Sequence, residues 1–296
     1  MFTSSDGRLH PVWAFVVSAL VSMLAFVVAG YVAEVIADDH LLLFEVIFRP
    51  LWAALLIALF VWMLTAADHV EDHAIAALGL PRSKGSVGQF FLGCAIGLVL
   101  TAIAVVPIAI WGDANTRIRL SFHALPRIGA VLVILLLGAL AEELMFRGYP
   151  FQHLVQGIGA VRAIMVFSVM FGAVHLANPG ANLWGLINTI LIGILLSLAY
   201  LRTRALWLPW GIHFGWNASL GFLFGLPVSG LRLFNVMVRT TVSGPKWVTG
   251  GSYGLEASGT AAVVILAGVV TVWKLPLQRL VQPLSPPEDR PAVTTS

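Results

Sequence analysis

Long apolar runs separated by short polar segments dominate the pattern of this chain. A membrane-spanning helix needs about 20 mostly apolar residues. Eight stretches approach or meet this length: residues 12–33, 50–66, 88–111, 128–149, 161–177, 182–201, 205–224 and 259–276. The pattern therefore predicts an all-α, polytopic membrane protein with about eight transmembrane helices.

Three segments interrupt this pattern in different ways. Residues 34–48 are mixed in character and too short to span a membrane, so they predict an interfacial helix. Residues 227–258 form a long segment rich in glycine and serine, and its part 249–256 suits either a flexible connector or a lid. Residues 283–296 contain a Pro-Pro pair and predict a disordered tail.

Composition supports a membrane protein and excludes several other classes. Hydrophobic residues make up 59% of the 296 residues and charged residues only 10%, with a mean hydropathy of +0.92. Soluble domains carry about 25% charged residues. The net charge of +3 is small and the basic residues are scattered, which argues against a nucleic-acid partner. Cys94, the single cysteine, lies in an apolar run and is interpreted as a packing residue.

The placement of the chain in a membrane follows from its first apolar run and its basic residues. The run 12–33 exceeds the apolar core of a cleaved signal peptide, about 7–15 residues, and predicts an anchor. The distribution of lysine and arginine over the connecting segments favours cytoplasmic termini. Short soluble segments and frequent alanine and arginine favour a bacterial inner membrane.

Glu142 and Glu143 stand inside one of these apolar helices, directly after the run 129–141. An ionised carboxylate at the centre of a membrane helix costs roughly 2.5–3.5 kcal/mol, so the chain must offset that cost. Arg147 follows Glu143 by four residues, and this spacing lets the two side chains pair. Glu142 points about 100° away and is left for chemistry. A buried ion network that only joins helices is the alternative.

Two further pairs of residues have the same spacing. Phe171-x-x-x-His175 and His213-x-x-x-Asn217 each place two side chains on one helix face. A single pair would be explained by packing or by a hydrogen bond between helices. Ionisable and amide groups from three predicted spans of one chain, however, tend to face a common cavity. We therefore expect Glu142, His175, His213 and Asn217 to converge.

These three motifs together resemble the signature of the CPBP family, the CAAX-protease and bacteriocin-processing group of intramembrane endopeptidases. The resemblance covers about residues 125–224. It implies peptide hydrolysis in a membrane-associated peptide or protein, including lipidated or transmembrane ones. Glu142 would act as general base, His175 would orient the water, and His213 and Asn217 would bind the oxyanion. Structural support would come from Glu143, Arg147 and Phe171.

The chain is divided accordingly into four parts. Residues 1–124 hold the N-terminal transmembrane helices and the interfacial segment, and residues 125–224 hold the catalytic helix core. Residues 225–282 contain the Gly-rich segment and the last transmembrane helix, and residues 283–296 form the tail. The predicted partners are the lipid bilayer and the substrate.

The sequence leaves open whether peptide hydrolysis at this site uses a metal ion. Catalytic zinc often takes three protein ligands and a water, and Glu142, His175 and His213 would supply such a set. The neutral amide of Asn217 suits an oxyanion donor better than a zinc ligand, so a site without cofactor is favoured. The motifs of site-2, rhomboid and presenilin-like proteases are absent from the sequence.

Two other functions remain as alternatives. Intramembrane Glu and His residues also mark proton paths, which would suit a proton-coupled transporter. Transporters more often show repeated halves, and no repeat is visible in this sequence. A non-catalytic membrane scaffold is the third possibility, and the intact set Glu142, His175, His213 and Asn217 argues against it.

Overall fold

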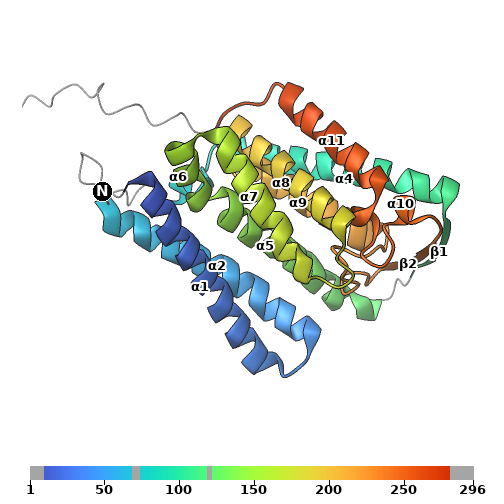
Figure 1. The fold of residues 1–296 in the computed structure, drawn as a ribbon. Helices are drawn as coiled ribbons and strands as arrows, with labels where there is room; N and C mark the ends of the chain where they lie inside the picture. The colour runs from blue at the N-terminus through green and yellow to red at the C-terminus, as the bar shows by residue number, and fades with distance from the viewer. Residues whose placement is uncertain (1–9, 69–73, 119–121, 281–296) are drawn as a thin grey trace, which may run out of the picture.

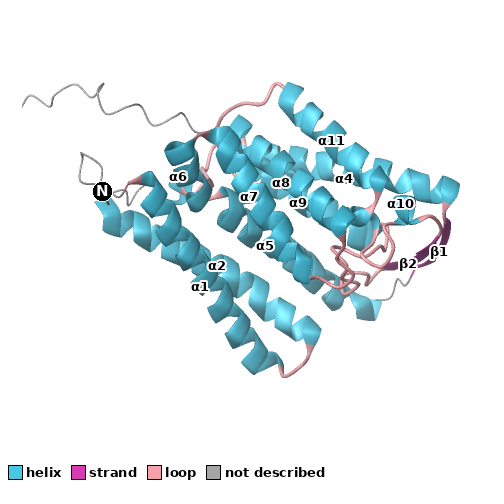
Figure 2. Ribbon diagram, viewed as in Figure 1, coloured by secondary structure: helices cyan, strands magenta, loops and turns pink. Residues whose placement is uncertain are grey.

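The computed structural model describes residues 10–68, 74–118 and 122–280, and shows a bundle of helices with a small two-stranded sheet at one end (Figures 1 and 2). The tail predicted at 283–296 lies outside these residues. The long elements are α1 Pro11–Ala37, α2 Leu41–Asp68, α4 Ser86–Trp111, α5 Leu125–Arg147, α7 Ala160–Val174, α8 Leu183–Thr203, α9 Trp207–Ala218 and α11 Gly259–Lys274. The short elements are α3 Ala74–Ala77, β1 Asp113–Ile118, η2 Phe122–Ala124, α6 Tyr149–Ile158, η3 His175–Ala177, η4 Ser219–Leu223, β2 Val238–Ser243, α10 Lys246–Thr249 and η5 Leu255–Ala257.

Within the described residues, six helical segments are long and apolar enough to cross a membrane. The shorter helix α11 is also apolar. The predicted all-α polytopic membrane fold is confirmed, and the protein is an integral membrane protein. The six segments are Pro11–Ala37, Leu41–Thr65, Ser86–Trp111, Leu125–Ile158, Ala160–Ala177 and Leu183–Thr203.

Two predicted segments differ from the observed elements. Residues 34–48, expected as an interfacial helix, instead form the end of α1, a tight turn and the start of α2. Asp38 and Asp39 make this turn with φ of 45° and 66°, a left-handed conformation that aspartate tolerates. The predicted span 205–224 is α9 followed by the five-residue π-helical turn η4, so it is shorter than a regular spanning helix.

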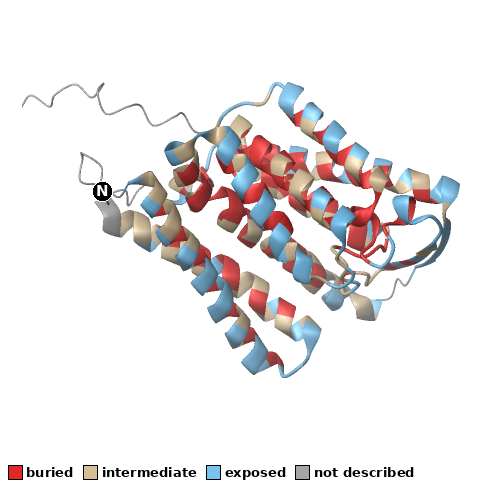
Figure 3. Ribbon diagram, in the orientation of Figure 1, coloured by how far each residue is buried: buried red, intermediate tan, exposed pale blue. Residues whose placement is uncertain are grey.

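The N-terminal helix α1 shows how the bundle separates its lipid and protein faces. Large apolar side chains such as Leu20 and Tyr31 are exposed on its outer face. Its inner face consists of alanine and serine, whose small side chains allow close approach of neighbouring helices in a membrane. The same division between a buried interior and an exposed exterior extends through the bundle (Figure 3). The small inner residues are Ala14, Ser18, Ser22, Ala25, Ala29, Ala33 and Ala37.

The helices α4 and α9 are in backbone contact through glycines spaced four residues apart. A Cβ atom at Gly97 would lie 2.4 Å from the carbonyl oxygen of Ile212, and one at Gly211 would lie 2.1 Å from that of Phe90. Gly93 and Gly215 face the partner helix in the same way. Such small-residue spacing lets helix backbones approach closely. This contact fixes the position of α9, which carries His213 and Asn217.

Two buried apolar clusters surround the polar centre of the bundle. One joins α4, α8, α9 and α11 and includes Leu100, Leu196 and Ile265. The other joins α1, α2, α5, α6 and α7 and includes Leu56 and Phe167. Helix α5 contributes to both clusters, with Ile134 in the first and Leu144 in the second.

The segment after α9 is more ordered than its glycine content suggested. Strand β2 pairs antiparallel with β1, from Asp113 opposite Ser243 to Ile118 opposite Val238. Residues 249–256 pack against α8, where the side-chain amide of Asn188 donates to the carbonyl oxygens of Glu256 and Ser258, both at 2.8 Å. Tyr253 is only 1% exposed. This segment is therefore part of the folded bundle.

Candidate functional site

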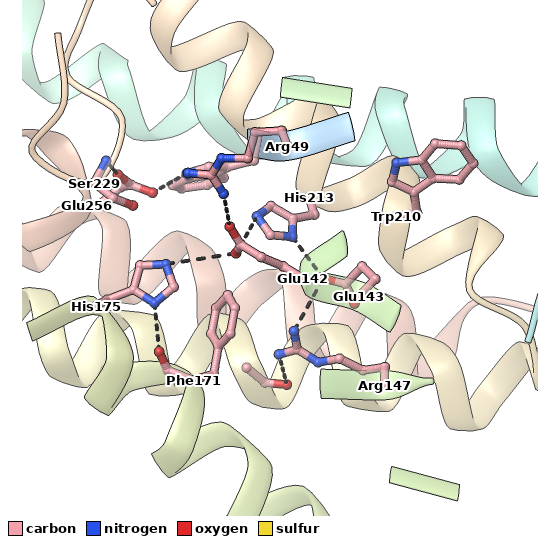
Figure 4. A network of polar contacts seen from close by, with 12 residues as sticks. Arg49, Glu142, Glu143, Arg147, Phe171, His175, Trp210, His213, Ser229 and Glu256 are labelled. Atoms are coloured by element: carbon pink, nitrogen blue, oxygen red, sulfur yellow. Dashed lines mark hydrogen bonds and ion pairs between the residues drawn. The ribbon is translucent and has the colours of Figure 1, made fainter. Parts of the chain in front are cut away.

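Glu142 on α5 lies at the centre of a group of charged and imidazole side chains (Figure 4). Its Oε1 accepts a hydrogen bond from Nη1 of Arg49 at 3.0 Å. Its Oε2 lies 3.7 Å from Nε2 of His213 and 4.0 Å from Nε2 of His175. Three elements distant in sequence, α5, the end of α7 and α9, thus bring three of the predicted residues to one carboxylate oxygen.

Glu143 lies on a different, fully buried face of α5. Its Oε1 accepts from Nη1 of Arg147 at 3.3 Å, as the i, i+4 spacing predicts. The same oxygen also lies 2.8 Å from Nδ1 of His213, a contact that the sequence does not indicate. Glu143 and Arg147 are both 0% exposed. Glu143 therefore orients His213 in addition to pairing with Arg147.

His175 follows the last residue of α7, and its ring orientation is fixed by its own helix. Nδ1 lies 2.7 Å from the backbone oxygen of Phe171. A carbonyl oxygen only accepts hydrogen bonds, so Nδ1 carries the hydrogen. The Nε2 of the neutral ring is then an acceptor, and it faces Glu142.

Phe171 links the two halves of the site through its ring. The guanidinium carbon of Arg147 lies 4.4 Å from the ring centroid, within cation–π distance. The ring centroid is also 4.6 Å from that of His175 and 6.1 Å from that of His213. Arg147 further donates to the backbone oxygen of Gly193 on α8 at 3.3 Å. These contacts join α5, α7 and α8 around the ring of Phe171 and the guanidinium of Arg147.

Asn217 lines the same cavity one helical turn after His213 and is half-buried. The cavity has a volume of ≈ 270 Å³ and lies between the pair α1–α2 and the rest of the bundle. Its wall is largely apolar. The structure thus brings all four predicted site residues to one cavity; its lining includes Met23, Phe26, Phe48, Trp52, Met145, Val174, Leu231 and Phe234.

Arg49 is a site residue that the sequence did not reveal. Its Nε donates to Glu45 at 2.7 Å, and its Nη1 donates to Glu142. Gly138 on α5 makes room for it, because a Cβ there would lie 3.1 Å from Cδ of Arg49. The i, i+4 spacing of Glu45 and Arg49 was a usable signal. The interpretation of residues 34–48 as interfacial concealed it.

Glu256 is a second buried carboxylate in the wall of the cavity, missed because it stands alone in a Gly-rich segment. It is 5% exposed. Its Oε1 accepts from Nε1 of Trp216 at 3.1 Å, and its Oε2 accepts from the backbone N–H of Ser229. Burial raises the pKa of this carboxyl above its usual range, and the hydrogen bond from Ser229 opposes that rise. Glu256 therefore connects the segment after α9 to Trp216 on α9, the residue before Asn217.

The arrangement of Glu142, His175 and His213, the predicted zinc ligands, does not fit a metal ion. Within the described residues, no group of three His, Cys, Asp or Glu side chains is arranged to hold one. The carboxylate of Glu142, which would have to be a ligand, is paired with the cation of Arg49. Repulsion between Arg49 and a divalent cation would weaken that ligand set.

Comparison with known proteins identifies the central part of the chain. Residues 124–219 match the family model described as Rce1-like, type II CAAX prenyl endopeptidase. No curated protein and no solved structure matches the chain. The matched segment contains all three motifs, from Glu142 to Asn217, and excludes Arg49 and Glu256. The predicted CPBP relationship is confirmed.

Proposed function

We propose that this protein, whose residues 124–219 form an Rce1-like CAAX prenyl endopeptidase domain, hydrolyses a peptide bond of a membrane-associated protein with Glu142 as general base. The family supports intramembrane endopeptidase activity and a membrane-associated protein substrate. The observation that carries the finer assignment is the convergence of Glu142 Oε2 with Nε2 of His175 and of His213. The transporter and scaffold alternatives lose support because the matched family model is described as an endopeptidase.

The spacing of these three atoms suits a shared water molecule. Separations of 3.7 and 4.0 Å are too long for direct hydrogen bonds, and contacts of this length are commonly bridged by water. Such a water would donate one hydrogen to Glu142 Oε2 and the other to Nε2 of neutral His175. Its lone pair would then be free to attack the carbonyl carbon of the substrate.

In the proposed mechanism, His213 and Asn217 stabilise the oxyanion. Because Nδ1 of His213 donates to Glu143, donation from Nε2 requires the imidazolium form of the ring. The carboxylate of Glu143 would balance that charge. The side-chain amide of Asn217 supplies a neutral donor one turn further along α9. A preorganised donor of this kind contributes a few kcal/mol to catalysis, about 2.7–4 kcal/mol in the best-known example.

The proton and bond changes balance without any further reactant. Glu142 takes a proton from the attacking water as the new carbon–oxygen bond forms. The tetrahedral intermediate then loses the amine, and the carbon–nitrogen bond breaks. Glu142 returns the proton to the leaving nitrogen, which yields a carboxylic acid and an amine. The acid then passes its proton to the amine, so the final products are a carboxylate and an ammonium group. The general base therefore ends the cycle ionised, as it began.

The cavity wall suits a substrate held in or at the bilayer. Phe26 and Met23 on α1 and Phe48 and Trp52 on α2 line one side of it. Apolar side chains of this kind favour apolar peptide segments or a lipid chain, while the few polar groups orient the reacting bond.

The experiment that tests this function begins with identification of the substrate. Membrane peptides from cells with the wild-type protein and with Glu142→Gln should be compared by mass spectrometry, and cleaved peptides should appear only with the wild type. The purified enzyme should then cleave the same peptide. A strong chelator should leave the rate unchanged, and elemental analysis should find no stoichiometric zinc. Activity lost on chelation and restored by zinc would contradict the metal-free mechanism but not the peptidase.

A further inference from the structure

A second cavity, separate from the catalytic one, is lined by three arginines. Arg127 at the start of α5, Arg232 in the segment after α9 and Arg239 on β2 line a space of ≈ 240 Å³. Among the described residues that line this cavity, none carries a carboxylate. Arg232 is held beside β2, where its Nη1 donates to the backbone oxygen of Thr240 at 3.5 Å. Part of its lining comes from β2, which lies with β1 at one end of the bundle (Figure 1).

These arginines occupy positions that are electrostatically unfavourable in the protein alone. Arg239 on β2 stands directly opposite Arg117 on β1, and like charges opposite each other destabilise a strand pair. Arg127 lies in the first turn of α5, which has no acidic residue, at the positive end of the helix dipole. In the described part of the chain, no salt bridge joins any of these arginines, or Arg232, to a carboxylate. A bound anion would relieve all of these costs at once.

Exposed apolar side chains lie near these arginines in the sequence. Phe122 is 89% exposed, Ile118 66% and Leu125 56%. All three lie close in sequence to Arg117 or Arg127, where the membrane-spanning helix α5 begins. Basic side chains beside exposed apolar ones at the end of a spanning helix match the two parts of a lipid, its charged headgroup and its acyl chains.

We propose that the arginine cavity binds the phosphate group of an anionic phospholipid. Guanidinium groups match phosphate geometry with paired hydrogen bonds, and three of them around one cavity provide more positive charge than a single phosphodiester needs. The exposed side chains of Phe122, Ile118 and Leu125 favour a lipid over a free phosphate ion, because they contact acyl chains that a free ion lacks.

The arginine cavity shares a chain segment with the catalytic cavity. Leu233, Asn235 and Val236 line the arginine cavity, while Leu231 and Phe234 of the same segment line the catalytic cavity. A lipid headgroup at the arginines would therefore stabilise the segment that forms part of the substrate wall.

Lipid binding is tested with purified full-length protein in a non-ionic detergent. Native mass spectrometry would measure the apparent Kd for phosphatidylglycerol and for phosphatidylcholine. The variant Arg232→Gln/Arg239→Gln should weaken phosphatidylglycerol binding about 25-fold, because each basic residue near an anionic surface contributes a factor of about five. Arg162→Gln is the matched control, because Arg162 is an exposed arginine at the start of α7, away from the arginine cavity. It should bind as the wild type does.

A second variant separates lipid binding from a structural role of the arginines. Arg117→Gln removes the like-charge pair with Arg239, so it should raise the melting temperature in detergent without lipid. The same variant should reduce the additional stabilisation that phosphatidylglycerol gives. A merely structural role would predict no dependence on lipid.

Two results would overturn the proposal. Equal binding of phosphatidylglycerol and phosphatidylcholine, or unchanged binding by Arg232→Gln/Arg239→Gln, would show that the arginines recognise no anionic headgroup. Glycerol 3-phosphate or inorganic phosphate that competes as tightly as the lipid would identify a soluble phosphate as the ligand. Neither result depends on peptidase activity.

Discussion

Glu142 and Glu143 are neighbours on α5, yet they lie in two different regions of the molecule. Glu142 faces the catalytic cavity with 16% of its side chain exposed, and its partner Arg49 comes from α2. Glu143 faces the interior with no exposed side-chain surface, and one of its oxygens serves both Arg147 and His213. The cavity region holds a carboxylate next to space for a reactant. The interior region holds one that is enclosed by its partners.

In the proposed mechanism, one helix thus supplies both the general base and a supporting carboxylate. The rotation of about 100° between consecutive residues puts the two carboxylates on separate faces. Glu143 pairs within its own helix, so its position depends on local geometry. Glu142 depends on a cation from outside the matched domain, so its position depends on how α2 packs against α5.

The largest expected effect is on the cavity side of this comparison. Glu142→Gln keeps the shape of the side chain and removes the basic oxygen, so the cleavage rate should fall roughly 10²–10⁴-fold, the range for loss of a general base. The melting temperature should change little. Undiminished cleavage by the purified variant would exclude Glu142 as the base.

On the interior side, loss of the carboxylate should lower stability and should also slow cleavage through the orientation of His213. Glu143→Ala leaves Arg147 buried without a carboxylate and should cost about 3–5 kcal/mol of unfolding free energy. The double variant Glu143→Ala/Arg147→Met should recover most of this stability, because the uncompensated charge is gone. It should remain slow, since His213 still lacks its partner on Nδ1. A double variant as unstable as Glu143→Ala would show that the pair is not the source of the loss.

A smaller effect is expected where the two regions depend on α2. Arg49→Gln removes a charged hydrogen bond to Glu142, worth about 1.5–3 kcal/mol, so kcat should fall roughly tenfold to a hundredfold through poorer orientation of the base. Arg49→Lys should restore part of the rate. Glu45→Gln, which removes only the second partner of Arg49, is the matched control and should retain more activity.

The smallest expected effect is a pH dependence of stability from Glu256. Burial raises the pKa of this carboxyl in the folded state above 4.5, its unperturbed value. Its stabilising contribution is therefore fully present below pH 4.5 and is lost as the pH rises through the folded-state value. Glu256→Gln should shift stability by a constant amount and remove this slope. Parallel melting curves against pH for the wild type and the variant would contradict the raised pKa.

The packing of α4 against α9 is tested separately from the four predictions above, because it is a contact between helix backbones rather than between charged groups. Gly97→Leu would place a side chain against the backbone of α9, where even a Cβ lies 2.4 Å from an oxygen. Overpacking of this kind typically costs about 1–3 kcal/mol, so the melting temperature should fall. Activity would also fall, because α9 carries His213 and Asn217.

Local patterns in the sequence predicted most of the long helices and the motif faces. Apolar runs near the length of a bilayer predicted the spanning helices, and i, i+4 spacing predicted the pairing of Glu143 with Arg147. The same spacing placed His213 and Asn217 on one face of α9. Their common cavity followed from the general tendency of ionisable groups in membranes to face one another.

Contacts between distant residues were decided only by the tertiary structure. Arg49 and Glu142 are 93 positions apart, and Trp216 and Glu256 are 40 positions apart. No helical period relates residues at such separations, and their contacts arise from the packing of α2 on α5 and of the segment 225–258 against α8 and α9. The sequence alone thus determined which residues share a helix face, because that depends on 3.6 residues per turn. Which faces meet was decided by the bundle, because that depends on the shapes of all the helices together.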